Sequence, residues 1–314
     1  MNDNRGMTPL RILFAGSPAA AVPSLQALIA GPHDVVAVVT REDAPLGRRR
    51  VLTPTPVAAA AEQAGIRVIR ANRLGPVTDE LLALGADLGV VVAYGGLIRE
   101  PLLSAPRLGW INLHFSLLPR WRGAAPVQRA IIAGDTETGA AVFRLVAELD
   151  AGPVLGELRR PIGRHETAGH LLDALSVSGA VLLGRVVDEL AAGAAHPVEQ
   201  EGEVTLAPKL TLEDGRVDWS QTAAAIDARI RGVTPEPGAF TELGDERIKL
   251  LEAGIARDSP RREPGRIASH AGRVLVGTAD DPIQLTTVQP AGRRAMAAAD
   301  WWRGRQPGAP DLAR

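Results

Sequence analysis

The sequence predicts an α/β fold in which helices cover both faces of a mostly parallel sheet, followed by a small C-terminal β-barrel. Short, continuous apolar runs alternate with helical stretches over the first two thirds of the chain, a pattern typical of strands buried on both faces. Beyond Gly193 the pattern changes to short β-like segments separated by glycine and proline. With 314 residues, the chain is long enough for two domains.

The expected elements of the sheet follow one another as strand and helix. Arg11–Gly16 is an apolar run that ends on glycine, and the helix Pro23–Ala30 follows, with proline in its first turn and Gly31 as its stop. The same reasoning predicts strands at Asp34–Thr40, Arg67–Ile69, Leu88–Ala93, Gly109–His114, Ala140–Leu145 and Pro153–Arg160, and helices at Pro56–Ala64, Pro76–Leu84, Ala125–Ala133 and Ala168–Ala192.

The C-terminal part reads differently. Ala194–Pro208 is irregular, and Ile226–Ile230 is the one helical stretch expected after it. We therefore expect a catalytic domain over 1–195, a linker over 196–209 and a barrel over 210–314. The strands expected in the barrel are Ile248–Glu252, Gly265–Ser269, Arg273–Gly277 and Ile283–Val288.

Composition limits the kinds of site that the chain can carry. It has no cysteine, which excludes disulfides and metal–thiolate sites. The polar start Met1–Met7 is unlike a signal peptide, and no stretch approaches the ~20 apolar residues of a membrane span, so we expect a cytoplasmic protein without a membrane partner. The formal net charge is −1, so a polyanionic partner has to be held by local clusters of basic residues.

The most informative segment is Ile111–Pro126, where an apolar strand breaks at proline and glycine before a helix starts. Asn112 and His114 lie two positions apart on the strand and therefore project to the same side. Ligands of open α/β sheets bind at such strand ends. A lone histidine there is more often structural, but an amide donor beside an imidazole is the minimal equipment for acyl transfer.

This segment resembles the signature of the 10-formyltetrahydrofolate-dependent formyltransferases, in which Asn-x-His precedes Ser-Leu-Leu-Pro. The continuation Arg120–Gln128 is similar to the branch that formylates methionyl-tRNA. The resemblance runs from about Arg11 to Gly304. It implies a Rossmann-like catalytic domain followed by an OB-like barrel that contacts tRNA. It also implies 10-formyltetrahydrofolate as co-substrate, no metal, and initiator methionyl-tRNA as partner of what we expect to be a monomer.

The resemblance also assigns catalytic roles. Asp150, in the turn Glu148–Pro153, matches a carboxylate of the family, although by itself it reads as a turn residue. Asn112 would stabilise the oxyanion, and His114 would carry the proton between the attacking amine and the leaving nitrogen. We expect Asp150 to raise the pKa of His114 and to orient the ring.

Two segments are implied to contact the folate. Ser116, Leu117, Leu118 and Pro119 form the first, and the loop Ala93–Leu97, with Tyr94 and Gly95, would offer backbone groups to the pterin ring. The sequence departs from the family pattern at Gly96, an extra glycine, and at Phe115, which is larger than the usual residue. We expect Phe115 to point away from Asn112 and His114.

A basic loop is implied to contact tRNA. The connection Thr40–Pro56 is longer than the 2–6 residues or so that a compact α/β unit needs. It contains Gly47, Arg48, Arg49 and Arg50, and Gly47-Arg48 aligns with a Gly-Arg of the tRNA-formylating branch. An arginine-rich loop is usually only solvated surface, and Ala44-Pro45 replaces the usual Arg-Pro.

The same residues leave two other functions open. The chain could formylate glycinamide ribonucleotide or a nucleotide-activated amino sugar, but neither reaction needs the barrel or the arginine loop. A non-catalytic RNA-binding module would not need a proton carrier aligned with Asn112. The turn after Gly16 lacks the glycines of a dinucleotide fingerprint, and His165 and His170, five positions apart, would not share a metal on a helix.

Overall fold

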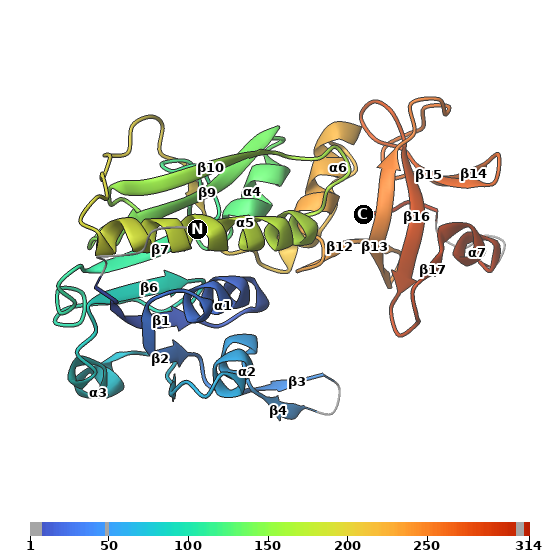
Figure 1. Ribbon diagram of the computed structural model, residues 1–314. Helices are drawn as coiled ribbons and strands as arrows, with labels where there is room; N and C mark the ends of the chain where they lie inside the picture. The colour runs from blue at the N-terminus through green and yellow to red at the C-terminus, as the bar shows by residue number, and fades with distance from the viewer. Residues whose placement is uncertain (1–7, 48–49, 306–310) are drawn as a thin grey trace. The chain divides into compact units, whose positions relative to one another are not determined.

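The computed structural model describes residues 8–47, 50–305 and 311–314 (Figure 1). By their internal contacts, these residues divide into two compact units. The first runs to Pro126 and includes Glu137–Pro161 and Leu172–Ala207. The second comprises Val127–Thr136, Ile162–Leu171 and the chain from Pro208 onward.

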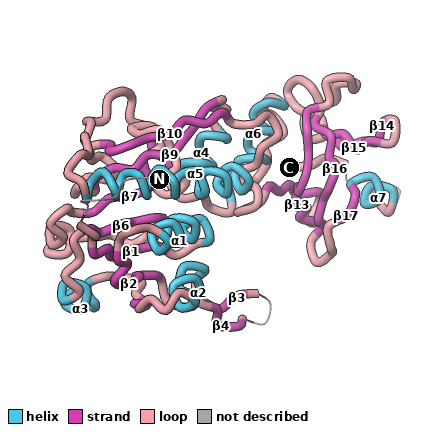
Figure 2. Tube along the Cα trace, viewed as in Figure 1, coloured by secondary structure: helices cyan, strands magenta, loops and turns pink. Residues whose placement is uncertain are grey.

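The first unit is built on a seven-stranded sheet with the order β10-β9-β7-β6-β1-β2-β5 (Figure 2). The five strands from β7 to β5 run parallel, whereas β9 and β10 pair antiparallel at one side. The predicted fold class is confirmed. The strands are β1 (Arg11–Gly16), β2 (Asp34–Thr40), β5 (Val68–Arg70), β6 (Leu88–Val92), β7 (Trp110–His114), β9 (Glu137–Arg144) and β10 (Val154–Pro161).

Helices flank this sheet. Helices α1 and α2 pack on β2, and Gly179 of α5 lies so close to Leu113 of β7 that an added Cβ would come within 3.0 Å of it. Thr55 caps α2 by accepting a hydrogen bond from the backbone N–H of Ala58, at 3.0 Å. The helices of this unit are α1 (Val22–Ala30), α2 (Pro56–Gln63), α3 (Thr78–Ala83) and α5 (Ala168–Ala191) from Leu172 onward, with 3₁₀ turns η1 (Ala19–Ala21) and η2 (Gly75–Val77). Helix α4 (Pro126–Ile132) belongs to the second unit from Val127 onward.

The structure also contains two small pairings that the sequence analysis did not predict. Strands β3 (Ala44–Leu46) and β4 (Val51–Thr53) form an antiparallel hairpin within the long connection after β2. Strands β8 (Arg122–Gly123) and β11 (Leu206–Ala207) pair in parallel, although 83 positions separate Gly123 from Leu206 in the sequence.

One expectation about apolar stretches was wrong. Helix α5 has 24 residues and is long and apolar enough to cross a membrane by length and composition. Half of its apolar window is buried in the protein, and a core helix passes the same test. Leu171, Leu175 and Leu183 are fully buried, whereas Val177 and Val181 are 61 and 72% exposed, so one side of the helix packs in the protein.

The second unit is an antiparallel sheet with the order β12-β13-β16-β15-β14, in which β17 also pairs with β16. Residues 311–314 pair with both ends of this order. The Ile267 N–H donates to the Asp311 carbonyl at 2.7 Å, and Glu242 and Arg314 exchange two backbone hydrogen bonds. The tail therefore closes the sheet into a barrel. The elements are η3 (Glu213–Gly215), α6 (Ala223–Gly232), β12 (Ala239–Leu243), β13 (Glu246–Ile255), β14 (Ile267–His270), β15 (Arg273–Val276), β16 (Ile283–Pro290), β17 (Met296–Ala297) and α7 (Ala298–Arg303).

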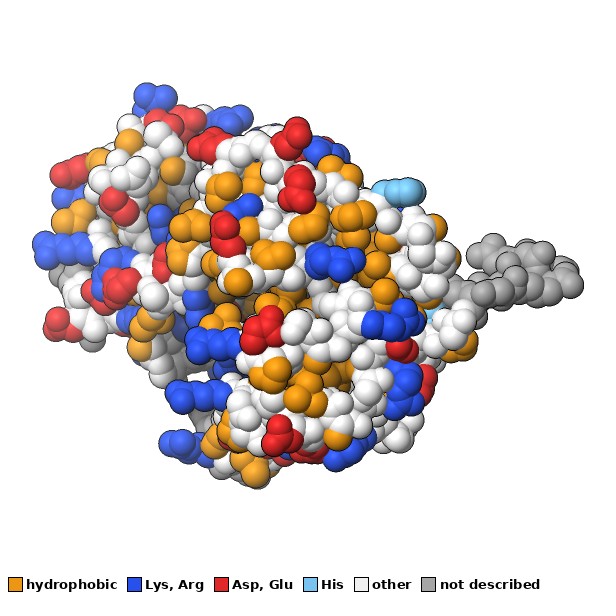
Figure 3. Space-filling model, turned by 90° about the vertical axis from the view of Figure 1, so that its left-hand side faces the viewer, with side chains coloured by type: hydrophobic (Ala, Val, Ile, Leu, Met, Phe, Trp, Pro, Cys, Tyr) orange, Lys and Arg blue, Asp and Glu red, His pale blue; other side chains and the backbone are white. Residues whose placement is uncertain are grey.

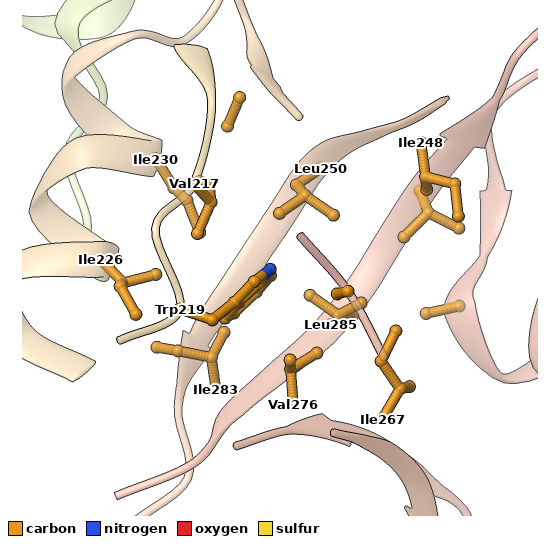
Figure 4. Packing of buried hydrophobic residues seen from close by; sticks show 14 of the residues in the cluster. Val217, Trp219, Ile226, Ile230, Ile248, Leu250, Ile267, Val276, Ile283 and Leu285 are labelled. Atoms are coloured by element: carbon orange, nitrogen blue, oxygen red, sulfur yellow. The ribbon is translucent and has the colours of Figure 1, made fainter. Parts of the chain in front are cut away.

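The core of the second unit surrounds Trp219. This side chain is 3% exposed and lies among Ile226 of α6 and Ile283 and Val276 of the sheet (Figure 4). Its indole N–H donates to Thr241 Oγ1 at 2.9 Å, which satisfies the buried polar atom. Ala298 and Trp301 of α7 belong to the same buried cluster, so two helices pack against the sheet of this unit.

The tail makes a prediction for stability. Removal of residues 311–314 breaks four backbone hydrogen bonds to Glu242, Gly265 and Ile267, each contributing about 0.5–1.5 kcal/mol. We expect the free energy of unfolding of the barrel to fall by at least about 2 kcal/mol in urea titrations. The control Asp311→Ala removes only an exposed ion pair with Arg266 and should cost less than about 1 kcal/mol. Equal losses for the two variants would contradict the closing role of the tail.

Candidate active site

Strand β7 carries the first two candidate residues. It lies inside the sheet, paired with β6 on one side and β9 on the other, so its position is fixed from both sides. Asn112 and His114 share a face because side chains alternate along a strand. Asn112 is partly exposed, and its side-chain amide makes no hydrogen bond to any residue that the structure describes, so it remains a free donor.

His114 is buried, with 5% of its surface exposed, and contacts three groups. Its Nε2 lies 2.8 Å from the backbone carbonyl of Trp121. Its Nδ1 lies 3.9 Å from Asp150 Oδ2, and the ring of Phe143 meets the imidazole edge-on with centroids 6.3 Å apart. Because a carbonyl only accepts, Nε2 carries the proton in the neutral ring and Nδ1 keeps the lone pair. A further proton would therefore arrive at Nδ1, on the side of the carboxylate.

The net pKa shift of His114 is opposite to the expected one. Burial lowers the pKa of His114 below its ordinary value of 6.5, and this effect outweighs the charge of Asp150 and the Trp121 carbonyl, which both raise it. Asp150 does raise the pKa of His114, as expected. The net shift is nevertheless downward, because burial has the larger effect. At neutral pH, His114 is consequently an uncharged base.

Asp150 is held by its neighbours in a conformation that non-glycine residues rarely adopt. Its φ is 47°, in the left-handed region. The Gly123 backbone N–H donates to Asp150 Oδ2 at 2.8 Å, and Gln200 Nε2 donates to the Asp150 carbonyl at 2.8 Å. The carboxylate of Asp150 is thus aimed at His114 from a well-anchored turn.

The four residues Ser116–Pro119 occupy mostly buried positions after β7. Ser116 is fully buried and its hydroxyl donates to the Arg120 carbonyl at 2.6 Å. Leu118 packs with Ala141 and Phe143. Leu117 is the most exposed of the four. Contact of this segment with the folate stays a prediction.

The loop after β6 is organised by Arg41. Its guanidinium donates to the carbonyls of Tyr94 and Gly95, at 3.2 and 2.8 Å. The Tyr94 side chain is 1% exposed and donates to the Ala71 carbonyl, so it packs inside the protein. A Cβ at Gly96 would come within 2.4 Å of the Tyr94 ring, which gives a physical reason for this extra glycine. Pterin contacts by this loop remain a prediction.

The basic loop is an exposed arm formed by β3 and β4. Leu46, Val51 and Leu52 are 67, 59 and 64% exposed, so among the described residues of the arm the apolar side chains are turned to the surface. Gly47 adopts a φ of 69° and accepts a hydrogen bond from the Arg50 backbone. Arg48 and Arg49, two of the predicted tRNA-binding residues, lie outside the described residues.

Three groups around His114 were not identified in the sequence. The Trp121 carbonyl is a backbone group that no side-chain motif announces, and Gly123 acts through its backbone N–H. Gln200 lies 50 positions from Asp150 in a segment that reads as irregular. Of the three, only Gly123 could have been suspected from the sequence, because it lies inside the signature segment Ile111–Pro126.

One face of the molecule carries no broad patch of basic side chains that would attract a polyanion. Basic and acidic side chains are interspersed over the face drawn in Figure 3. Within residues 8–47, 50–305 and 311–314 there is also no group of three or more His, Asp or Glu side chains able to hold a metal ion.

Two family models match the chain. A formyl transferase model matches residues 10–187, and a model of the formyl transferase C-terminal domain matches residues 209–306. A methionyl-tRNA formyltransferase of Clavibacter sepedonicus is 62% identical over 296 residues, covering 94% of this chain and 97% of that protein. One from Leifsonia xyli subsp. xyli is 58% identical over 301 residues, with the same coverage of the two chains.

Solved structures share the fold at much lower identity. An N-formyltransferase from Helicobacter canadensis, crystallised with folinic acid and dTDP-3-aminofucose, superposes with a TM-score of 0.68 at 15% identity. The match covers 88% of this chain and 98% of that one. At 15% identity, the structural similarity shows a shared fold and nothing about the substrate.

The lowered pKa of His114 makes a prediction for stability. The unfolded chain binds a proton near pH 6.5 more readily than the folded protein, so this residue costs stability as the pH falls below that value. We expect the free energy of unfolding of His114→Gln to fall less than that of the wild type between pH 8 and pH 5. Urea titrations at each pH measure it, and His196→Gln, on an exposed histidine, is the matched control. Parallel pH profiles for the wild type and His114→Gln would contradict the burial argument.

Proposed function

The chain belongs to the formyl transferase family, and from that premise we infer that it formylates the α-amine of methionine on initiator methionyl-tRNA. The formyl donor is 10-formyltetrahydrofolate. The product, N-formylmethionyl-tRNA, serves translation initiation. We propose that the enzyme acts as a monomer in the cytoplasm.

The observation that carries this proposal is the arrangement of three side chains, two from strand β7 and one from the turn between β9 and β10. Asn112 offers an amide that pairs with none of the described residues, His114 is a neutral base, and Asp150 faces its Nδ1 at 3.9 Å. A purely RNA-binding protein needs none of these. Methionyl-tRNA formyltransferases that match nearly the full length of this chain at 62 and 58% identity support the choice of substrate.

The reaction needs an oxyanion donor and a proton carrier. A bond forms between the methionine nitrogen and the formyl carbon, and the bond from that carbon to N10 of the folate breaks. The Asn112 amide stabilises the negative charge that develops on the formyl oxygen. His114 accepts the proton of the amine at Nδ1 and returns it to N10, so the net transfer is of one proton and one formyl group in opposite directions.

Asp150 supports His114 in the charged state that exists between these two transfers. Its carboxylate lies on the side of Nδ1, where the imidazolium carries its new proton. Burial disfavours that charge, and the carboxylate offsets part of the penalty. The ring is therefore poised to accept a proton and to release it again.

We propose that the folate is held by Ser116, Leu117, Leu118 and Pro119 together with backbone groups of Tyr94 and Gly95. These segments follow β7 and β6, which are neighbours in the sheet and end at the same edge. We propose that Gly47, Arg48, Arg49 and Arg50 contact the tRNA, assisted by basic residues of the barrel over 210–314.

Formylation of glycinamide ribonucleotide or of a nucleotide-activated amino sugar is the alternative within the same fold. The direct test incubates the purified protein with 10-formyltetrahydrofolate and either methionyl-tRNA, glycinamide ribonucleotide or an amino sugar nucleotide. Formyl transfer to methionyl-tRNA supports the proposal, and transfer only to a small acceptor refutes it.

Replacement of Asn112 or His114 by alanine is expected to lower kcat at least about 100-fold, the usual scale for losing an oxyanion donor or a proton carrier. Single-turnover formylation of methionyl-tRNA measures the loss. Gln63→Ala, on an exposed helix end, controls for the handling of variants. Near-normal turnover of either alanine variant would remove that residue from the mechanism.

The arginine arm is expected to act on one substrate only. Because the net charge is −1 and tRNA must be held locally, Arg48→Ala should raise the KM for methionyl-tRNA by about tenfold and leave the KM for 10-formyltetrahydrofolate unchanged. The salt dependence of KM for tRNA should also become shallower. Arg164→Ala, an exposed arginine elsewhere, is the matched control. An equal effect on both substrates would mean that the arm shapes the site in general.

A further inference from the structure

The segment Gln200–Ala207 is fastened to the catalytic unit residue by residue, although its sequence reads as a linker. Leu206 and Ala207 pair with Arg122 and Gly123 as a parallel two-stranded sheet. The Ala207 carbonyl also accepts from the Ala125 N–H at 3.1 Å. A Cβ at Gly123 would come within 2.7 Å of the Ala207 oxygen, so the two backbones touch.

Gln200 uses all of its amide groups in this attachment. Its Nε2 donates to the carbonyls of Asp150 and Gly152, both at 2.8 Å. Its Oε1 accepts from Arg122 Nε and NH2, at 3.2 and 2.8 Å. Arg122 is 9% exposed and also donates to Glu148 at 3.1 Å. A charged donor on Oε1 polarises the amide and strengthens the two bonds that Nε2 makes.

Thr205 makes the corresponding attachment on the other side of His114. Its Oγ1 accepts from the Trp121 N–H at 2.9 Å, and its carbonyl accepts from the Arg122 N–H at 2.9 Å. The Trp121 carbonyl is the group that holds His114 Nε2. One short segment therefore holds both groups that flank the imidazole.

The backbone of these two groups needs such support. Asp150 and Trp121 have φ values of 47° and 63°, in the left-handed region where side chains other than glycine are strained. Such conformations persist where the surrounding contacts overdetermine them, and they gather at functional sites. Both residues are hydrogen-bonded to the segment that begins at Gln200: Trp121 donates to Thr205, and Asp150 accepts from Gln200.

We propose that Gln200 and Thr205 are positioning residues of the formyl transfer reaction, which hold Asp150 and the Trp121 carbonyl against opposite nitrogens of His114. The inference rests on the proposed function for its kinetic part only. Neither side chain touches the reacting atoms. Both act on the placement of the charge and of the hydrogen bond that set the protonation of His114.

The test uses Gln200→Met and Thr205→Val, which keep the size of each side chain and remove its hydrogen bonds. Exposed Gln63→Met is the control for the first change. Thr78→Val is the control for the second, since Thr78 donates to the Leu74 carbonyl far along the sequence from the site. The pKa of the His114 imidazole is measured by NMR titration without substrates, and kcat, KM and the pH–rate profile with both substrates.

We expect the His114 pKa to fall in both variants, because Asp150 and the Trp121 carbonyl are the two groups that raise it. Asp150 is the charged group that acts on the ring. The charged side chains of Arg122 and Glu148 lie beside it in the Gln200 network, where Arg122 donates to both Gln200 and Glu148. The acidic limb of the pH–rate profile should move to lower pH, as it should in the benchmark Asp150→Asn. A displacement of Asp150 or the Trp121 carbonyl by about 1 Å misorients His114. We therefore expect kcat of both variants to fall by about 10- to 100-fold and KM to change by less than about threefold.

The outcomes separate the two hypotheses. An unchanged His114 pKa in both folded variants overturns the positioning roles, whatever the activity. A loss of kcat without movement of the acidic limb also overturns them, because a merely structural role would produce it. If the wild type transfers no formyl group, the proposed function fails while the NMR titration still decides the positioning. If Gln200→Met does not fold, the same measurements on Thr205→Val, which loses only one hydroxyl, decide the test.

Discussion

The burial of one imidazole between a carbonyl and a carboxylate is the constraint on which the catalytic unit depends. Burial makes His114 a neutral base, and that neutral ring needs its Nε2 proton bonded to the Trp121 carbonyl. The carboxylate of Asp150 then has to lie on the other nitrogen, at a distance where it moderates the penalty for charge without holding the proton permanently. The left-handed turns at Trp121 and Asp150 follow from this requirement, because each presents its group from a tight bend.

A sheet alone cannot provide this arrangement, which explains why distant segments converge on it. Strand β7 aims Asn112 and His114, but the partners of His114 come from a loop after β7 and from the β9–β10 connection. Both are irregular, and irregular backbone is held by side chains or by other backbone. Gln200 and Thr205 supply those bonds from 50 and 84 positions away along the chain.

The sequence predicted the elements better than the contacts among them. Period-two alternation placed Asn112 and His114 on one face without any structure, and apolar runs located the strands of the parallel sheet to within a few residues. Asp150 was found only by resemblance, since a turn aspartate has no periodic signal. Gln200 and the Trp121 carbonyl could not be found, because neither tertiary pairing nor a left-handed tryptophan is written into local composition. The hairpin of β3 and β4 was missed for a similar reason: Pro45 and its exposed apolar side chains resemble a loop.

The electrostatic design separates chemistry from recognition. His114, the proton carrier that we propose, faces the carboxylate of Asp150 in a buried setting, where charges act strongly and salt screens them little. The face drawn in Figure 3, in contrast, intersperses both signs of charge, so this face offers a polyanion no broad field to follow. Binding energy for a tRNA then has to come from contacts at defined places, and the arm formed by β3 and β4 is the place that we propose. On these proposals, changes in the arm weaken the binding of methionyl-tRNA, whereas changes around Gln200 slow the formyl transfer that follows.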